Sequence, residues 1–171
     1  MAIRPYESDH LIETGKIKMK LYLMRHGEAL HPANDPLMRL SPKGREDAAR
    51  MAVALRAKGV CPQAIWHSPK ERAFETAQIV GVELQVIDLQ KVSEIQPESP
   101  IESVRSRLNA LSQKEDAALL IVSHMPFLPA LTAALLGCRL PAPDFETASV
   151  LYLEHQASGW TRGWLLRPRD L

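Results

Sequence analysis

Two histidines in this 171-residue chain have neighbours that suit them to chemistry. His26 follows Arg25 and precedes Gly27, whereas His124 stands in a Ser-His-Met-Pro run, and a further arginine, Arg72, lies in a polar run that begins with Ser-Pro. A neutral imidazole nitrogen is a competent nucleophile toward phosphorus, and arginine offers forked, permanently charged donors to phosphoryl oxygens. Together these residue types favour phosphoryl transfer through a covalent phosphohistidine.

Fixed cations stabilise the charge that a transferred phosphoryl group carries on its equatorial oxygens. We expect Arg25 and Arg72 to supply that charge, so that neither a metal nor another cofactor is required. His124 is expected to donate a further hydrogen bond, and Gly27 allows the backbone to pass close to the nucleophile.

These residues can meet only if the segments that carry them pair in one sheet. Hydrophobic patterning predicts strands at residues 20–25, 63–66, 84–87, 117–122, 149–154 and 160–166. It predicts helices at residues 42–58, 70–80, 101–111 and 126–136, with Gly81 ending the second of them and a loop over residues 88–100.

Alternating strands and helices predict an α/β fold, a three-layer α/β/α sandwich with a mostly parallel central sheet. Ligands of such sheets bind beyond the carboxyl ends of the strands. His26, Arg72 and His124 should therefore share one pocket, with Glu28 and Glu94 near its edge.

Composition excludes several other classes of protein. With 46% hydrophobic and 24% charged residues the chain is expected to fold, and a net charge of +1 argues against nucleic acid or a membrane surface as the main partner. Two cysteines, Cys61 and Cys138, are too few for a disulfide framework or a thiolate zinc site. Residues 1–18 lack the apolar centre of a signal peptide and are expected to form a polar tail before one domain at 19–171, in the cytoplasm.

The remaining histidines have plainer explanations. His10, His31, His67 and His155 are interpreted as surface or structural residues. Metal binding is a weak alternative because the chain has no His-Glu-x-x-His motif, and His26 and His31 are five residues apart across a turn. Glycine-rich nucleotide-binding motifs are absent from the sequence.

Five motifs in order resemble the histidine phosphatase superfamily, also called phosphoglycerate mutase-like. They are Leu-Met-Arg-His-Gly-Glu at 23–28, Leu-Ser-x-x-Gly at 40–44, Ser-Pro-x-x-Arg-Ala-x-x-Thr at 68–76, Glu-x-x-Pro at 94–97 and Ser-His-x-Pro at 123–126. Within the superfamily the chain looks most like the short SixA-type phosphohistidine phosphatases. An acidic residue directly after the second histidine marks the acid phosphatase branch; Met125 stands there and disfavours that branch.

The resemblance implies a role for each matching residue. His26 would be the nucleophile, Arg25, Arg72 and His124 would bind the phosphoryl group, and Glu94 stands where many members place a proton donor. Glu28 is an equally good candidate either for that proton or for orienting the loop. Three residues of the preceding loop are further candidates for lining the pocket: Asn34, Asp35 and Arg39.

Length restricts the substrate. Only 46 residues separate Thr76 from Ser123, which leaves no room for the cap domain of larger members. An uncapped pocket suits a phosphate displayed on a protein, and phosphohistidine releases an imidazole, a better leaving group than an alkoxide. The leading hypothesis is therefore a metal-independent phosphatase for phosphohistidine on a protein, as in a phosphotransfer domain. Small phosphomonoesters and non-catalytic phosphate recognition remain alternatives, and the oligomeric state is open.

Overall fold

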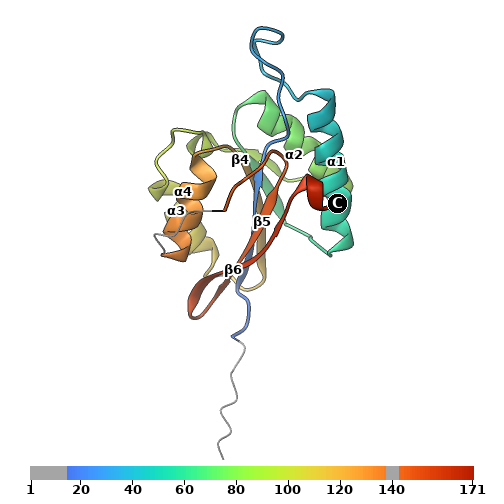
Figure 1. Cartoon of the computed structure of the whole chain (residues 1–171). Helices are drawn as coiled ribbons and strands as arrows, with labels where there is room; N and C mark the ends of the chain where they lie inside the picture. Colours follow the sequence, from blue (N-terminus) through green and yellow to red (C-terminus); the bar gives the residue numbers. More distant parts are fainter. Residues whose placement is uncertain (1–14, 138–142) are drawn as a thin grey trace, which may run out of the picture.

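One six-stranded sheet forms the centre of the molecule, and helices cover both of its faces (Figure 1). The computed structural model describes residues 15–137 and 143–171. The strands are β1 (Met19–Arg25), β2 (Ala64–His67), β3 (Leu89–Lys91), β4 (Ala117–Ser123), β5 (Val150–Gln156) and β6 (Gly159–Leu166). The helices are α1 (Pro42–Ala57), α2 (Glu71–Leu84), α3 (Glu102–Leu111) and α4 (Phe127–Leu136), with short 3-10 helices at Ser93–Ile95 and Pro168–Asp170.

The strand order is β3-β2-β4-β1-β5-β6, and the first four strands run parallel to one another. Strand β5 pairs antiparallel with β1, and β6 pairs antiparallel with β5. The predicted α/β sandwich with a mostly parallel sheet is therefore confirmed. In the register, Arg25 pairs with Ser123 and His67 with Val122, so β1, β2 and β4 end at the same edge.

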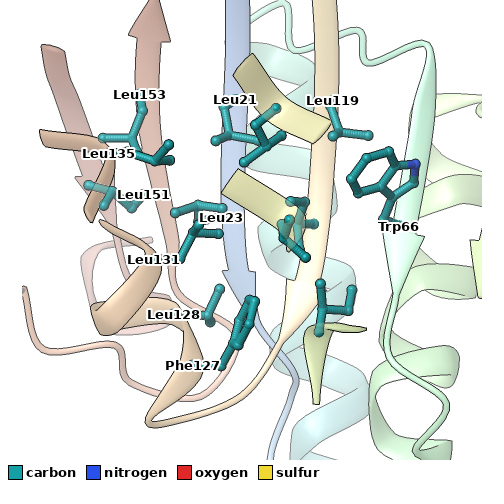
Figure 2. Close-up of a cluster of buried hydrophobic side chains, with 14 of the residues drawn as sticks. Leu21, Leu23, Trp66, Leu119, Phe127, Leu128, Leu131, Leu135, Leu151 and Leu153 are labelled. Carbon is teal, nitrogen blue, oxygen red and sulfur yellow. The ribbon is translucent and has the colours of Figure 1, made fainter. Parts of the chain in front are cut away.

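Alternating side chains of β1 enter the two halves of the core. Leu21 and Leu23 are fully buried against the α3 and α4 side, as Figure 2 shows, whereas Tyr22 and Met24 face α1 and α2. Burial of one such aliphatic side chain stabilises the fold by about 1.5–3 kcal/mol. Both faces of the central strands are thus covered, which explains their continuous apolar sequence.

Helix α1 begins as its sequence predicts. Ser41 caps the helix by accepting a hydrogen bond from the backbone N–H of Gly44 at 3.0 Å, and Pro42 occupies the first turn. Ser41 also donates to the Glu28 carboxylate at 2.7 Å. The start of α1 is therefore fastened to the chain just after β1.

The prediction was wrong at residues 81–91. Gly81 does not end α2; the helix continues to Leu84 and stops at Gln85, which adopts the left-handed conformation at φ 57°. Gly81 is retained inside the helix because it packs closely, and a Cβ there would lie 3.1 Å from the Val86 carbonyl oxygen. The third strand consequently forms at Leu89–Lys91 rather than at 84–87.

Part of the predicted polar tail lies outside the described residues, namely 1–14. Of the remainder, the backbone N–H of Lys18 donates to the His155 carbonyl oxygen at 2.8 Å, next to the start of β1. None of the helices in the described part of the chain is long and apolar enough to cross a membrane.

Two glycines bring α1 against the loop that follows β1. A Cβ on Gly27 would lie 2.6 Å from the Gly44 carbonyl oxygen, and a Cβ on Gly44 would lie 2.8 Å from the Glu28 backbone nitrogen and overlap the Glu28 carbonyl. These atoms all belong to the backbone, so a side chain at either position requires a main-chain shift.

We expect Gly44→Ala to lower the free energy of unfolding by about 1–3 kcal/mol because of this overlap, although alanine is the better helix former. Urea denaturation measures the change, with Glu46→Ala on the exposed side of the same helix as the control. Unchanged or increased stability of Gly44→Ala would contradict the close approach.

Candidate active site

The residues that directly follow three parallel strands lie close together. His26 follows β1, Ser68 follows β2 and His124 follows β4. The ladder continues beyond the strands, since the backbone N–H of His26 donates to the Ser123 carbonyl at 3.1 Å and that of Ser68 to the Val122 carbonyl at 3.2 Å. The backbone therefore fixes both histidines, and their ring centroids lie 4.9 Å apart.

Hydrogen bonds to the His26 ring identify which nitrogen carries its proton. Nδ1 lies 2.7 Å from the Gly27 carbonyl oxygen, which can only accept, and Arg72 Nε donates to Nε2 at 3.2 Å. Nδ1 is therefore protonated and Nε2 presents its lone pair. Nucleophilic attack by Nε2 requires that this nitrogen carry a lone pair and no proton.

Burial keeps the His26 ring neutral. With only 8% of the residue exposed, desolvation lowers its pKa to about 4, and the charges of Arg72 and Arg25 act in the same direction against the Gly27 hydrogen bond. At neutral pH the imidazole is uncharged, and its Nε2 is unprotonated and accepts the Arg72 N–H.

Two guanidiniums flank this ring. Arg25 ends β1 and donates from Nη1 to the Phe145 carbonyl at 2.7 Å, whereas Arg72 stands in the first turn of α2. Burial lowers the pKa of both; the Asp144 carboxylate opposes this effect at Arg25, whereas the charge of Arg25 lowers the pKa of Arg72 further. An anion placed between them would relieve this repulsion.

Thr76 connects the two arms of the site. Its hydroxyl accepts from the Gly27 N–H at 3.0 Å and donates to the Arg72 carbonyl at 2.7 Å. The loop that carries His26 is thereby joined to the helix that carries Arg72. The motif at 68–76 contains Thr76, but spacing alone does not show which backbone groups a buried hydroxyl reaches.

His124 is held by Ser68, a residue to which the sequence motifs assign no role. Its Nε2 lies 2.5 Å from the Ser68 hydroxyl, and only 1% of the residue is exposed. Burial lowers the pKa of His124 well below its usual range, and the nearby His26 ring and the Arg72 charge act in the same direction. A second neutral imidazole therefore lies beside the first.

An open groove begins beside Arg72. Lys70 lines it together with residues 96–100, which precede α3, and its volume is about 570 Å³. The groove lies on the surface, with no additional domain above it among the described residues. A group bound between the arginines could thus belong to a much larger molecule.

Comparisons with known proteins agree with this geometry. Residues 21–99 match the family described as the histidine phosphatase superfamily (branch 1). Phosphohistidine phosphatase SixA of Escherichia coli (strain K12) is 30% identical over 159 residues, which are 90% of this chain and 96% of that protein. The chain belongs to branch 1 of the histidine phosphatase superfamily.

Two solved structures share the fold. The protein histidine phosphatase SixA in complex with tungstate superposes with a TM-score of 0.81 at 29% identity, over 89% of this chain and 99% of that one. A phosphoserine phosphatase variant from Entamoeba histolytica, solved with phosphoserine, gives a TM-score of 0.70 at 15% identity, over 90% and 99%. The second likeness concerns the fold alone.

Glu94 pairs with an arginine of α3. Its carboxylate is 3.8 Å from Arg107 Nη1 and 47% of its side chain is exposed, while Arg107 stacks over Trp66 at 4.1 Å. The described residues show no hydrogen bond between Glu94 and His26, and the role of Glu94 as a proton donor stays a prediction.

Glu28 has a structural partner. Its carboxylate accepts from Ser41 at 2.7 Å, as described for the start of α1, and its backbone carbonyl accepts from the Ser41 N–H at 2.9 Å. These bonds correspond to the loop-orienting alternative for Glu28.

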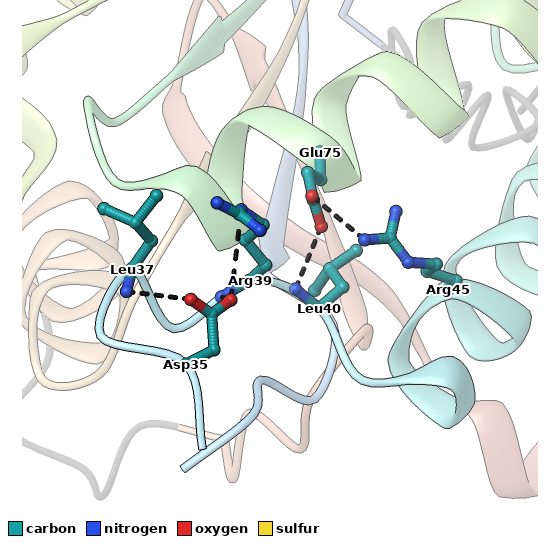
Figure 3. Close-up of polar contacts among 6 residues, drawn as sticks. All are labelled: Asp35, Leu37, Arg39, Leu40, Arg45 and Glu75. Carbon is teal, nitrogen blue, oxygen red and sulfur yellow. Dashed lines mark hydrogen bonds and ion pairs between the residues drawn. The ribbon is translucent and has the colours of Figure 1, made fainter. Parts of the chain in front are cut away.

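The loop candidates shape the loop itself (Figure 3). The Asp35 carboxylate accepts from the backbone N–H groups of Leu37 at 3.1 Å and Arg39 at 3.2 Å, and it lies 3.9 Å from Arg39 Nε. Glu75 on α2 accepts from the Leu40 N–H at 2.9 Å and from Arg45 at 3.0 Å. Asn34 donates its backbone N–H to the His31 carbonyl at 2.9 Å, so the contacts of Asn34 and Asp35 stay within the loop, whereas those of Glu75 join the loop to α2.

The other histidines occupy structural or surface positions. His67 is buried at the end of β2, and its ring lies 5.1 Å from that of Phe74. His155 on β5 lies beside Trp160 on β6. His31 accepts a hydrogen bond from the Ala33 N–H at 3.2 Å. His10 and Cys138 lie outside the described residues, and Cys61 is exposed. Over the ranges 15–137 and 143–171, the structure has no group of three or more His, Cys, Asp or Glu residues able to hold a metal ion.

The low pKa of His26 can be observed directly. In an NMR titration of the free protein, its ring should change protonation near pH 4, because the buried charged form is disfavoured beside two arginines. Added tungstate should raise the midpoint, since an anion favours the imidazolium. The resonance is assigned from its absence in His26→Asn, and a midpoint near 6.5 in the free protein would refute the buried neutral state.

The Thr76 bridge predicts a stability difference between two buried threonines. Thr76→Val leaves the buried Gly27 N–H without a partner and should cost about 1–3 kcal/mol in urea unfolding. Thr132→Val is the matched control, because Thr132 is equally buried in α4 and donates only to the Leu128 carbonyl of its own helix at 2.8 Å. Equal losses in the two variants would show that the Gly27 contact contributes nothing.

Proposed function

We propose that this chain is a phosphatase that removes the phosphoryl group from a phosphohistidine on a protein, through a covalent phosphohistidine on His26. The observation that carries the proposal is the buried neutral His26, whose Nε2 lone pair faces Arg72 in a site open to the surface. Kinship with the SixA phosphohistidine phosphatase of Escherichia coli supports the same substrate class.

The reaction takes two displacements at phosphorus. In the first, the His26 Nε2 lone pair forms the new N–P bond while the substrate's P–N bond breaks, and its electron pair remains on the departing imidazole, which takes a proton from solvent. In the second, water attacks phosphorus, the bond to Nε2 breaks with its pair returning to the ring, and orthophosphate leaves as the water gives up a proton.

The two arginines and His124 bind the phosphoryl oxygens in this proposal. Their donors are fixed by burial and by the backbone before substrate arrives, so little reorganisation accompanies the transition state. A tungstate ion occupies the related SixA structure, and the cationic pair in this chain would bind an oxyanion of the same shape. No metal is invoked, because guanidiniums supply the charge.

The position of Glu94 agrees better with phosphohistidine than with a phosphate ester. An alkoxide leaving group requires a well-placed proton donor, whereas an imidazole leaves readily because its nitrogen protonates near neutral pH. Glu94 pairs with Arg107 at 3.8 Å and about half of its side chain is exposed, so this proposal does not assign it the proton. A proton from solvent is sufficient for the imidazole.

The open surface supports a protein partner over a small metabolite. A shallow site beside the groove of Lys70 admits a phosphate displayed on a folded domain, and a phosphotransfer domain has that form. In this proposal residues 19–171 form the catalytic domain.

The decisive experiment compares a phosphotransfer domain labelled with ³²P on histidine with a panel of sugar phosphates. We expect rapid turnover of the phosphoprotein and an acid-labile label on His26. His26→Ala should abolish both, and Arg72→Ala should slow turnover by about 10³–10⁵-fold, the range for an arginine that stabilises the transition state. Arg105→Ala on the exposed side of α3 serves as the control for loss of one arginine.

Each alternative has its own outcome. Turnover confined to sugar phosphates would make the chain a small-molecule phosphatase. An unchanged rate in His26→Ala together with no acid-labile label would leave phosphate recognition without catalysis.

A further inference from the structure

The contact between Ser68 and His124 lies wholly inside the protein. Ser68 is fully buried, and its hydroxyl lies 2.5 Å from His124 Nε2. The same oxygen accepts the backbone N–H of Lys70 at 3.3 Å. The other ring nitrogen, His124 Nδ1, is also buried and has no hydrogen-bond partner among the described residues.

The available donors and acceptors favour one tautomer of His124. If the proton is on Nδ1, the Ser68 hydroxyl donates to Nε2, accepts from Lys70, and is satisfied; only Nδ1–H lacks a partner. If the proton is on Nε2, the Ser68 oxygen accepts twice, its own proton has no acceptor, and Nδ1 is unpartnered as well. The second arrangement leaves two buried polar groups unsatisfied instead of one, so the first arrangement is favoured.

We propose that Ser68 is a positioning residue that fixes neutral His124 in the tautomer protonated on Nδ1, so that Nδ1–H is the donor for a bound phosphoryl group. The tautomer follows from hydrogen bonding in the free protein; only the assignment of Nδ1–H to a phosphoryl oxygen rests on the proposed function.

The tautomer matters because burial keeps His124 uncharged. An imidazolium can donate from both nitrogens, but a neutral ring donates from one and presents a lone pair at the other. With Nε2 occupied by Ser68, a lone pair on Nδ1 would repel an anionic oxygen, whereas Nδ1–H attracts it. Ser68 therefore determines whether His124 helps or hinders binding of an oxyanion.

The backbone holds both partners in place for this task. The Ser68 N–H donates to the Val122 carbonyl of β4, and His124 directly follows that strand. Both ends of the contact are thus anchored on the β2–β4 ladder.

Long-range ¹H–¹⁵N NMR of the ring nitrogens tests the proposal on the unmodified protein. We expect the directly bonded proton on Nδ1 and a pyridine-like shift for Nε2 of His124. In Ser68→Ala the preference should be lost, and the tungstate dissociation constant should rise about tenfold, the effect of one weakened hydrogen bond to the anion. A proton on Nε2 in the unmodified protein would overturn the proposal.

Ser123→Ala is the matched control. Ser123 is fully buried beside His124, but its hydroxyl donates to the Ile95 carbonyl at 2.6 Å. This variant should lose stability while keeping the His124 tautomer. Ser68→Thr, which retains the hydroxyl, should restore the Nδ1–H form; if its extra methyl prevents folding, the spectrum of the unmodified protein still decides.

The same experiment separates this proposal from the proposed phosphatase. Absence of turnover in the unmodified protein would end the phosphatase proposal without affecting the tautomer. A correct tautomer with an unchanged tungstate constant in Ser68→Ala would overturn the positioning role while leaving the phosphatase intact.

Discussion

Burial of a neutral imidazole between two guanidiniums is the constraint on which the rest of the molecule depends. An exposed imidazole would titrate near its ordinary pKa, so the fold must bury His26 while keeping Arg25 and Arg72 charged beside it. The parallel pairing of β1 with β4 and of β4 with β2 brings the ends of these strands to one edge of the sheet, where His26 is buried. The two helical layers pack on the faces of the sheet and stabilise the strands whose ends carry the site.

Much of the fold could be predicted from local sequence. The apolar runs of β1 and β4, the Ser41-Pro42 start of α1 and the glycine after α4 each carry a signal within a few residues. Gly81 misled the prediction, because glycine usually interrupts helices. Its place inside α2 depends on how near the Val86 backbone passes, and that is a tertiary contact which no local pattern contains.

The site shows the same division. Motif order was sufficient to name His26, Arg25, Arg72 and His124, and parallel strands bring them to one edge of the sheet. The partners that orient them, Ser68 and Thr76, act through hydroxyl groups whose targets are backbone atoms or rings far along the chain. Glu94 was named from its motif alone, and its pairing with Arg107 depends on where α3 packs.

Gly27 and Gly44 have a consequence for how this sequence can change. Because neither glycine has a side chain, the backbone of the loop after β1 and the backbone of the first turn of α1 lie in direct contact. A side chain at either position requires a shift of the main chain opposite it. A change in the loop after β1 is therefore coupled to the position of the first turn of α1.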